Sequence, residues 1–143
     1  MADNPGVYPL DPATEVGQIR LLVGDTQSVA YDPPQTGVQS YETFSDAEIE
    51  AFLSAADGSF EDAVAYAYLS LAGRASAESE TVKDYDLTVD LTKKATDYRN
   101  LAEVWFSRGL DSKETSAEDA FEVVPTGRRQ SHVKPELAPW SFR

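Results

Sequence analysis

Apolar side chains recur at helical spacing in four stretches of this chain, the first of them near the N-terminus. Asp11 or Thr14 can cap a helix here, and Gly24 followed by Asp25 is a typical helix end. The apolar stripe between these signals consists of Val16, Ile19, Leu22 and Val23. The pattern predicts a short helix with one buried face.

The clearest local signal predicts a second helix. Ser45 and Glu48 have the spacing of a capping box, in which each side chain bonds the backbone of the other. Phe44 can pack against Ile49 across the first turn as a hydrophobic staple. Asp57-Gly58 is expected to end this helix.

Two further helices are predicted in the middle of the chain. Ser59 can cap the third helix, whose apolar positions include Phe60, Val64, Ala67, Tyr68 and Leu71. Residues 74–90 are predicted to be an acidic connection, and Asp90 at its end can cap the fourth helix. The stripe of that helix is Leu91, Ala95, Tyr98, Leu101, Ala102, Trp105 and Phe106. Gly109 is expected to end it in a left-handed conformation.

Residues 25–43, between the first two helices, are predicted to form a long surface loop. Pro33-Pro34 and Gly37 disfavour regular structure, and loops of this length are usually functional or disordered. A neighbouring subunit could cover the side chains of Tyr31, Val38 and Tyr41, which are the candidate inter-subunit residues of this loop. The alternative is a loop without a role.

Residues 111–143 do not continue the helical pattern and are predicted to be an extended tail. Residues 120–124 alternate enough for a β-strand, which would pair with another copy, lie on the bundle or stay mobile. Large aromatic side chains near a terminus favour docking into a partner, although a disordered tail with incidental aromatics is the alternative. The candidate interface residues are Phe121, Val123, Val124, Arg128, Arg129, Trp140 and Phe142.

These elements predict a mainly α fold: a small four-helix bundle with a long surface loop and an extended C-terminal tail that contains a possible β-strand. The expected organisation is an N-terminal arm at residues 1–11, a helical-bundle domain at 12–110 and a docking tail at 111–143. The core of such a bundle is small for a chain of 143 residues, so oligomerisation is expected to bury more of its surface.

Charge adds information about partners. The net charge is −13, and it is uneven: residues 1–124 carry 24 acidic and 8 basic groups, whereas residues 125–143 have a net charge of +3. An acidic body repels the phosphate backbone, so ordinary duplex binding by the body is disfavoured. The remaining explanations of the acidic charge are solubility, imitation of DNA, or a channel surface along which DNA slides without binding.

The residues for catalysis are largely missing. There is no cysteine, the one histidine is His132 in the predicted tail, and no phosphate-binding glycine motif occurs. We therefore expect no enzyme activity, no cofactor and no metal site. The chain also has no long apolar run for a membrane span and no secretory signal at its start, so synthesis in a cytoplasm is expected.

Three sequence pieces, taken in order and spacing, resemble a known family. They are IRLLVGDT at residues 19–26, FSDAEIEAFL at 44–53 and NLAE at 100–103, and the resemblance covers about residues 14–106. The chain resembles the head-to-tail connector, or adaptor, proteins of long-tailed, siphovirus-type bacteriophages, particularly those that infect actinobacteria. No single piece is diagnostic; the order and spacing carry the resemblance.

The resemblance implies a structural role in the neck of the virion. Such adaptors form a ring, commonly twelve-fold, beneath the portal protein; the ring extends the DNA channel and provides a platform for the stopper protein and the tail. Genomic DNA would pass through the lumen without specific binding, and C-terminal extensions would reach the portal or adjacent subunits. The alternative function is an acidic DNA mimic or regulatory protein that binds a host nucleic-acid enzyme.

Overall fold

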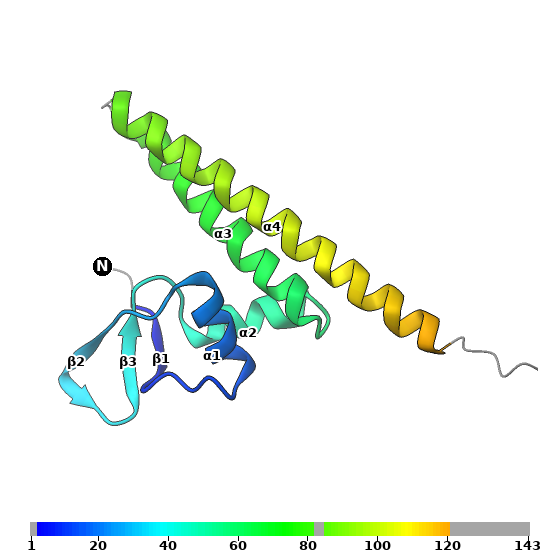
Figure 1. Cartoon of the computed structure of the whole chain (residues 1–143). Helices are drawn as coiled ribbons and strands as arrows, with labels where there is room; N and C mark the ends of the chain where they lie inside the picture. Colours follow the sequence, from blue (N-terminus) through cyan, green and yellow to red (C-terminus); the bar gives the residue numbers. More distant parts are fainter. Residues whose placement is uncertain (1–2, 82–84, 121–143) are drawn as a thin grey trace, which may run out of the picture. The chain divides into compact units, whose positions relative to one another are not determined.

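The computed structural model describes residues 3–81 and 85–120, which form four helices and a small sheet (Figure 1). The elements are β1 (Pro5–Val7), α1 (Glu15–Val23), β2 (Ser28–Gln35), β3 (Val38–Tyr41), α2 (Asp46–Ala55), α3 (Phe60–Thr81) and α4 (Tyr85–Ala120). A mainly α fold is thus confirmed. One compact unit ends at Asp111 and a second begins at Ser112; the contacts described below lie within the first.

The ends of α1 and α2 agree with the sequence. The Thr14 hydroxyl accepts a hydrogen bond from the Gly17 amide at 3.0 Å, and Gly24 closes α1 with a left-handed φ of 80°. Ser45 and Glu48 form the predicted capping box at the start of α2. Gly58, with a φ of 81°, lies at the predicted end of α2.

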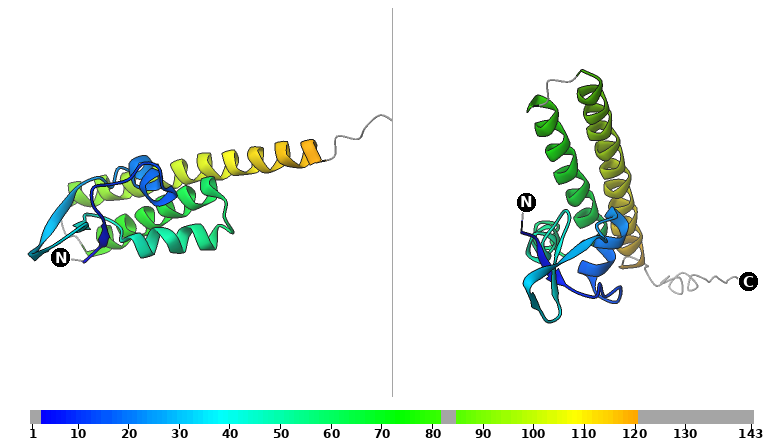
Figure 2. Two further views of the ribbon diagram at one scale, coloured as in Figure 1. Left: turned by 90° about the horizontal axis from the view of Figure 1, so that it is seen from below. Right: turned by 90° about the vertical axis from the view of Figure 1, so that its left-hand side faces the viewer.

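The core lies where α1 and α2 pack on α3, and α4 runs back along α3 (Figures 1 and 2). Small side chains on α3 allow this close approach: Ala63, Ala65 and Ala67 are completely buried. Phe44 and Phe52 meet edge to face, with ring centroids 5.3 Å apart. The larger residues of this core are Ile19, Phe44, Ile49, Val64 and Tyr68.

The prediction of an unstructured loop at residues 25–43 is wrong. β2 and β3 form an antiparallel hairpin there, and β1, from the predicted N-terminal arm, pairs with β3 to give the order β1-β3-β2. Pro33-Pro34 is tolerated because β2 is an edge strand and because the pairing is irregular between Ala30 and Gln35. Gly37 provides the positive φ of 75° in the turn.

The predicted connection at residues 74–90 is also wrong, because most of it is helical. α3 continues to Thr81, which is consistent with the alanine, arginine and glutamate content of its second half. α4 begins at Tyr85, so Asp90 lies inside the helix and is not its cap.

The predicted end of the last helix at Gly109 is a further error, because α4 continues to Ala120. Gly109 is buried, and a Cβ atom at this position would collide with the Asp62 side chain of α3. The glycine therefore serves close helix packing. Residues 111–120, predicted as the start of an extended tail, are helical, while residues 121–124 of the predicted strand lie outside the described residues.

Candidate functional site

A buried arginine lies between α1, α2 and the sheet. Arg20 is only 1% exposed. Its Nη1 donates to Asp25 Oδ2 at 2.6 Å, and its Nη2 donates to Asp46 Oδ1 at 2.7 Å. Its Nε also donates to Asp46 Oδ1, at 3.2 Å. Two carboxylates thus compensate the buried guanidinium, as a charge out of water requires.

Both carboxylates have further partners in the backbone. Asp25 accepts hydrogen bonds from the Thr43 amide at 2.9 Å and from the Phe44 amide at 3.0 Å. Asp46 Oδ2 accepts from the Val7 amide at 2.9 Å. The ion cluster of Arg20, Asp25 and Asp46 therefore connects α1, the segment before α2, the start of α2 and β1.

Tyr41 completes the surroundings of the guanidinium. The Arg20 Cζ atom lies 3.7 Å from the centre of the Tyr41 ring, close enough for a cation–π contact. The Tyr41 hydroxyl donates to the Val7 carbonyl at 2.7 Å. Burial raises the pKa of Tyr41 above its ordinary value, although the positive charge of Arg20 acts in the opposite direction.

The first strand fits closely against this cluster. A Cβ atom at Gly6 would lie 2.7 Å from Arg20 Nη2 and 2.7 Å from Asp46 Oδ1, so a side chain there would displace the ion pair. The Asn4 side-chain amide donates to the Tyr41 carbonyl at 3.0 Å and to the Glu42 carbonyl at 3.3 Å. Residues 4–7 are therefore an integral part of the fold.

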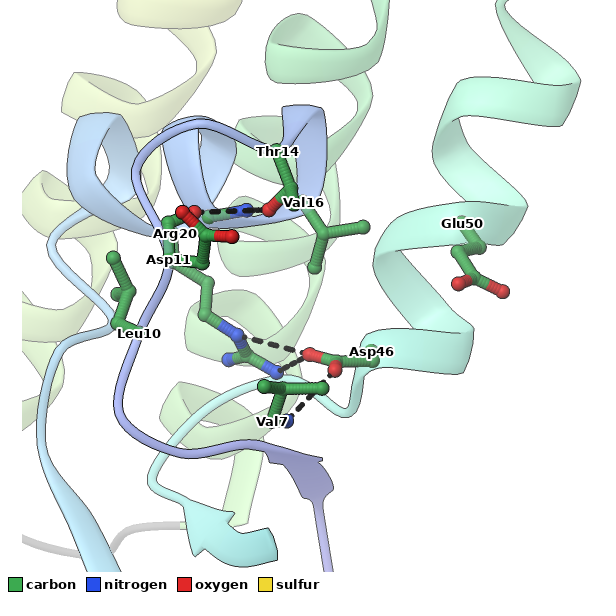
Figure 3. A pocket seen from close by; sticks show the side chains of 9 residues that line it. Val7, Leu10, Asp11, Thr14, Val16, Arg20, Asp46 and Glu50 are labelled. Carbon is green, nitrogen blue, oxygen red and sulfur yellow. Dashed lines mark hydrogen bonds and ion pairs between the residues drawn. The ribbon is translucent and has the colours of Figure 1, made fainter. Parts of the chain in front are cut away.

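A recess of about 290 Å³ opens beside the ion cluster (Figure 3). It is lined by Val7, Leu10, Asp11, Thr14, Val16, Gly17, Arg20, Asp46 and Glu50. Figure 3 shows Arg20 extending toward Asp46, while Glu50 stands apart on α2. Arg20 and Asp46 are already paired, and no cysteine, histidine or activated nucleophile lines the recess. Its lining is a mixed apolar and acidic surface around the Arg20–Asp46 pair.

The three candidate loop residues have different environments. Tyr41 is 2% exposed and buried within its own chain, so its assignment as a contact point for a neighbouring subunit is wrong. Tyr31 and Val38 are partly exposed and keep that assignment as a prediction. The Tyr31 hydroxyl bonds the Asp3 carboxylate at 2.5 Å, and this hydrogen bond raises the pKa of Tyr31.

The candidate interface residues of the tail are not part of the described structure. Phe121, Val123, Val124, Arg128, Arg129, Trp140 and Phe142 all lie outside the described residues. Nearer to the core, α4 presents Leu101 and Val104 to the surface, and Arg108 covers the Trp105 ring at 4.7 Å. Of these residues, the predicted buried stripe included Leu101, which is exposed, and Trp105, which is partly buried against the core.

Sequence analysis missed the ion cluster, although one signal was present. Arg20 follows Val16 by four residues and precedes Val23 by three, so it lies on the buried side of α1. A charged residue at such a position needs a buried counter-charge. Which carboxylates provide it depends on tertiary structure, because Asp46 is 26 residues away.

Neither a metal centre nor a membrane-spanning helix is found in the part of the chain that the structure describes. Within residues 3–81 and 85–120, no group of three or more histidine and acidic side chains is arranged to hold a metal ion. No helix in these ranges is both long and apolar enough to cross a bilayer. No family model, curated protein or solved structure matches the chain.

Proposed function

We propose that the protein is a head-to-tail adaptor of a long-tailed bacteriophage. In this proposal, α1 to α4 are the four-helix bundle of the adaptor, and residues 111–143 include the segment that docks on the portal. Copies form a ring, twelve-fold like the portal, that extends the DNA channel in the neck of the virion and carries the stopper protein. The mechanism is assembly, and the protein has no catalytic role.

The observation that carries the proposal is the position of the residues behind the resemblance. Arg20 and Asp25 belong to the piece IRLLVGDT, and Asp46 belongs to FSDAEIEAFL. These three side chains form the central ion cluster, with N–O distances of 2.6 and 2.7 Å. Two pieces that are separate in the sequence are therefore one structural unit. This supports a resemblance in architecture to the adaptor family over a chance resemblance of short sequence segments.

The charge distribution supports passage of DNA without retention. Residues 1–62 contain 12 acidic side chains and one basic side chain, Arg20, which is buried. Several of these acidic residues are exposed, including Asp11, Glu15, Asp32 and Glu50. Repeated around a ring, they would give a negative surface that repels the DNA backbone.

A DNA mimic is the rival, and the arrangement of the carboxylates argues against it. Two of the carboxylates, Asp25 and Asp46, are engaged by Arg20, and Glu48 is engaged by its capping box and by Arg74. These three of the 25 acidic side chains stabilise the fold, so they are engaged within the chain. A mimic requires its carboxylates to be free to face a basic partner.

The copy number in purified phage particles tests the proposal. Quantitative mass spectrometry would compare the amount of this protein with the amount of portal protein. We expect a ratio near one to one, because an adaptor ring matches the portal. Absence from particles would exclude the adaptor and favour the DNA mimic, which competition with DNA for a basic host protein would then examine.

A further inference from the structure

Among the strands that the structure describes, β2 has one edge that pairs with no other strand. It is the last strand in the order β1-β3-β2, so one side of its backbone faces away from the sheet. Val29, in the first half of this strand, is 65% exposed. An exposed edge of this kind can accept an additional strand, because its N–H and C=O groups have no partner in the sheet.

The register identifies the backbone groups on that edge. The Glu42 amide donates to the Gln27 carbonyl at 3.1 Å, so Gln27 and Glu42 form a hydrogen-bonded pair. Such pairs alternate along an antiparallel ladder, so the next one is Val29 with Ser40. Ser28 and Ala30 therefore direct their N–H and C=O groups away from β3.

The hydrogen bonds between β3 and β1 agree with this alternation. The Tyr41 amide donates to the Asn4 carbonyl at 2.9 Å, so Tyr41 directs its backbone toward β1 rather than toward Ser28 of β2. The two outward residues of β2 can together exchange up to four backbone hydrogen bonds with an added strand.

A recess lined by paired residues of β2 and β3 can receive a side chain of the added strand. It has a volume of about 270 Å³ and is lined by Gln27, Ser28, Val29, Ser40, Tyr41 and Glu42. In strand addition, backbone bonds provide affinity and pockets for alternate side chains provide specificity. The edge and the recess together have the features of a site for a short extended peptide.

The length of the site is limited at one end. Pro33 and Pro34 have no N–H group, and the β2–β3 pairing is irregular between Ala30 and Gln35. The regular part of the edge is therefore Ser28–Ala30, the residues of β2 that pair with β3 before the register shift. A longer strand would lose its partners at the prolines.

We propose that residues 121–124 of a second copy of this chain add as a strand to the Ser28–Ala30 edge. This inference rests on the proposed ring of adaptor copies and names one contact within it. The segment Phe121-Glu122-Val123-Val124 has the alternating, β-branched character of a strand and is followed by Pro125. Its four residues are long enough to span the three residues of the regular edge.

Charge favours the same pairing. The segment at residues 125–143 has a net charge of +3, with Arg128 and Arg129 close behind the proposed strand. The receiving hairpin has the exposed acidic side chains of Asp32 and Glu42 near it. Opposite charges on the two parts favour this orientation of copies, and such a head-to-tail contact can close into a ring.

Proline at residue 30 tests the receiving edge in the full chain. Ala30→Pro removes a donor that faces away from β3, so the hairpin keeps its own hydrogen bonds. We expect self-association, measured by analytical ultracentrifugation, to weaken by about tenfold or more. Thr36→Pro is the matched control: it places proline before Gly37 in the turn, a position that tolerates it, and leaves the edge unchanged. Equal association of both variants and the unchanged chain would overturn the proposal.

A mixing experiment tests the origin of the strand. The double substitution Glu122→Pro with Val123→Pro removes adjacent donors, one of which faces β2 in either register. Each variant alone should fail to assemble, and a mixture of this variant with Ala30→Pro should give a one-to-one complex, since one intact edge meets one intact strand. Two results together would contradict pairing between copies: an unchanged chain that is monomeric, and a mixture that gives no complex. The edge would then be filled by a strand of its own chain or of a portal protein.

Hydrogen exchange provides a measurement that does not depend on the folding of Ala30→Pro. In the assembled chain, the amides of Ser28 and Ala30 should be protected, and the Glu122→Pro/Val123→Pro variant should lose this protection while the Val29 amide keeps it. Equal exchange in both chains would reject the inference. The copy number in particles is a separate readout, so the adaptor proposal can hold when this contact fails.

Discussion

Arg20 illustrates how one buried charge determines the positions of several segments. Its guanidinium bonds Asp25 and Asp46 and lies over the Tyr41 ring. The two carboxylates in turn accept three hydrogen bonds from backbone amides. A buried ion pair is not in itself a large source of stability, because removing charges from water offsets much of the attraction. Its effect is specificity: an arrangement that separates these groups leaves a charge buried without a partner.

Removal of one carboxylate should therefore be costly. We expect Asp25→Ala to lower the free energy of unfolding by about 3–5 kcal/mol, because the Arg20 charge and the Thr43 and Phe44 amides lose their partner. Urea-induced unfolding measures this change. Glu50→Ala is the control, since Glu50 is exposed on α2 and should change stability by no more than about 0.5 kcal/mol. Equal effects of the two substitutions would contradict the role assigned to the cluster.

Buried tyrosines should make the fold sensitive to alkaline pH. Burial raises the pKa values of Tyr41 and Tyr68 above the ordinary value of 10.0, so each favours the folded state while it stays protonated. This contribution is complete below pH 10 and is lost as pH rises through the higher folded pKa values. Thermal melts between about pH 8 and 11 should show a falling midpoint, and Tyr41→Phe/Tyr68→Phe should flatten the fall. An unchanged slope in the double variant would reject this explanation.

At the scale of elements, local signals predicted both ends of α1 and α2 well, but they misplaced the end of α3 and both ends of α4. The caps at Thr14 and Ser45 were correct because a cap is made within a few residues of sequence. Gly109 was misinterpreted as a helix end because its reason, contact with Asp62, lies on another helix. The hairpin at β2 and β3 was missed because Pro33-Pro34 excludes a central strand but is compatible with an edge strand.

Two glycines of the long helices should respond in opposite ways to alanine. Gly73 of α3 is exposed with open space around its position, so Gly73→Ala should stabilise by about 0.5–1 kcal/mol through helix propensity alone. At Gly109 the same change brings a methyl group against Asp62, and we expect a net loss of about 1–3 kcal/mol. Chemical denaturation of the two variants gives both values. Stabilisation by both would show that the Asp62 side chain moves aside at no cost.

At the scale of the whole chain, the sequence predicted the fold class but not the ion cluster or the edge of β2. The mainly α class followed from the apolar stripes, whose buried members include Ile19, Val64 and Ala102. The ion cluster and the edge of β2 arise from contacts between segments that are far apart in sequence, such as Asn4 with Tyr41. Pattern reasoning does not determine such contacts, so it predicted the helices that carry the site but not the site.

Different parts of the chain should determine stability and docking. Among the described residues, the core cluster extends no further than Phe106, so a chain that lacks residues 120–143 should keep its secondary structure and its unfolding midpoint. The adaptor proposal assigns docking to that tail, so the same truncation should fail to join the portal and disappear from particles. Circular dichroism with urea unfolding measures the first property, and quantitative mass spectrometry of particles measures the second. A control truncation of Arg143 alone removes one charge and should leave both unchanged. Normal incorporation of the longer truncation would refute docking through the tail, whereas loss of folding would mean that the tail also supports the core.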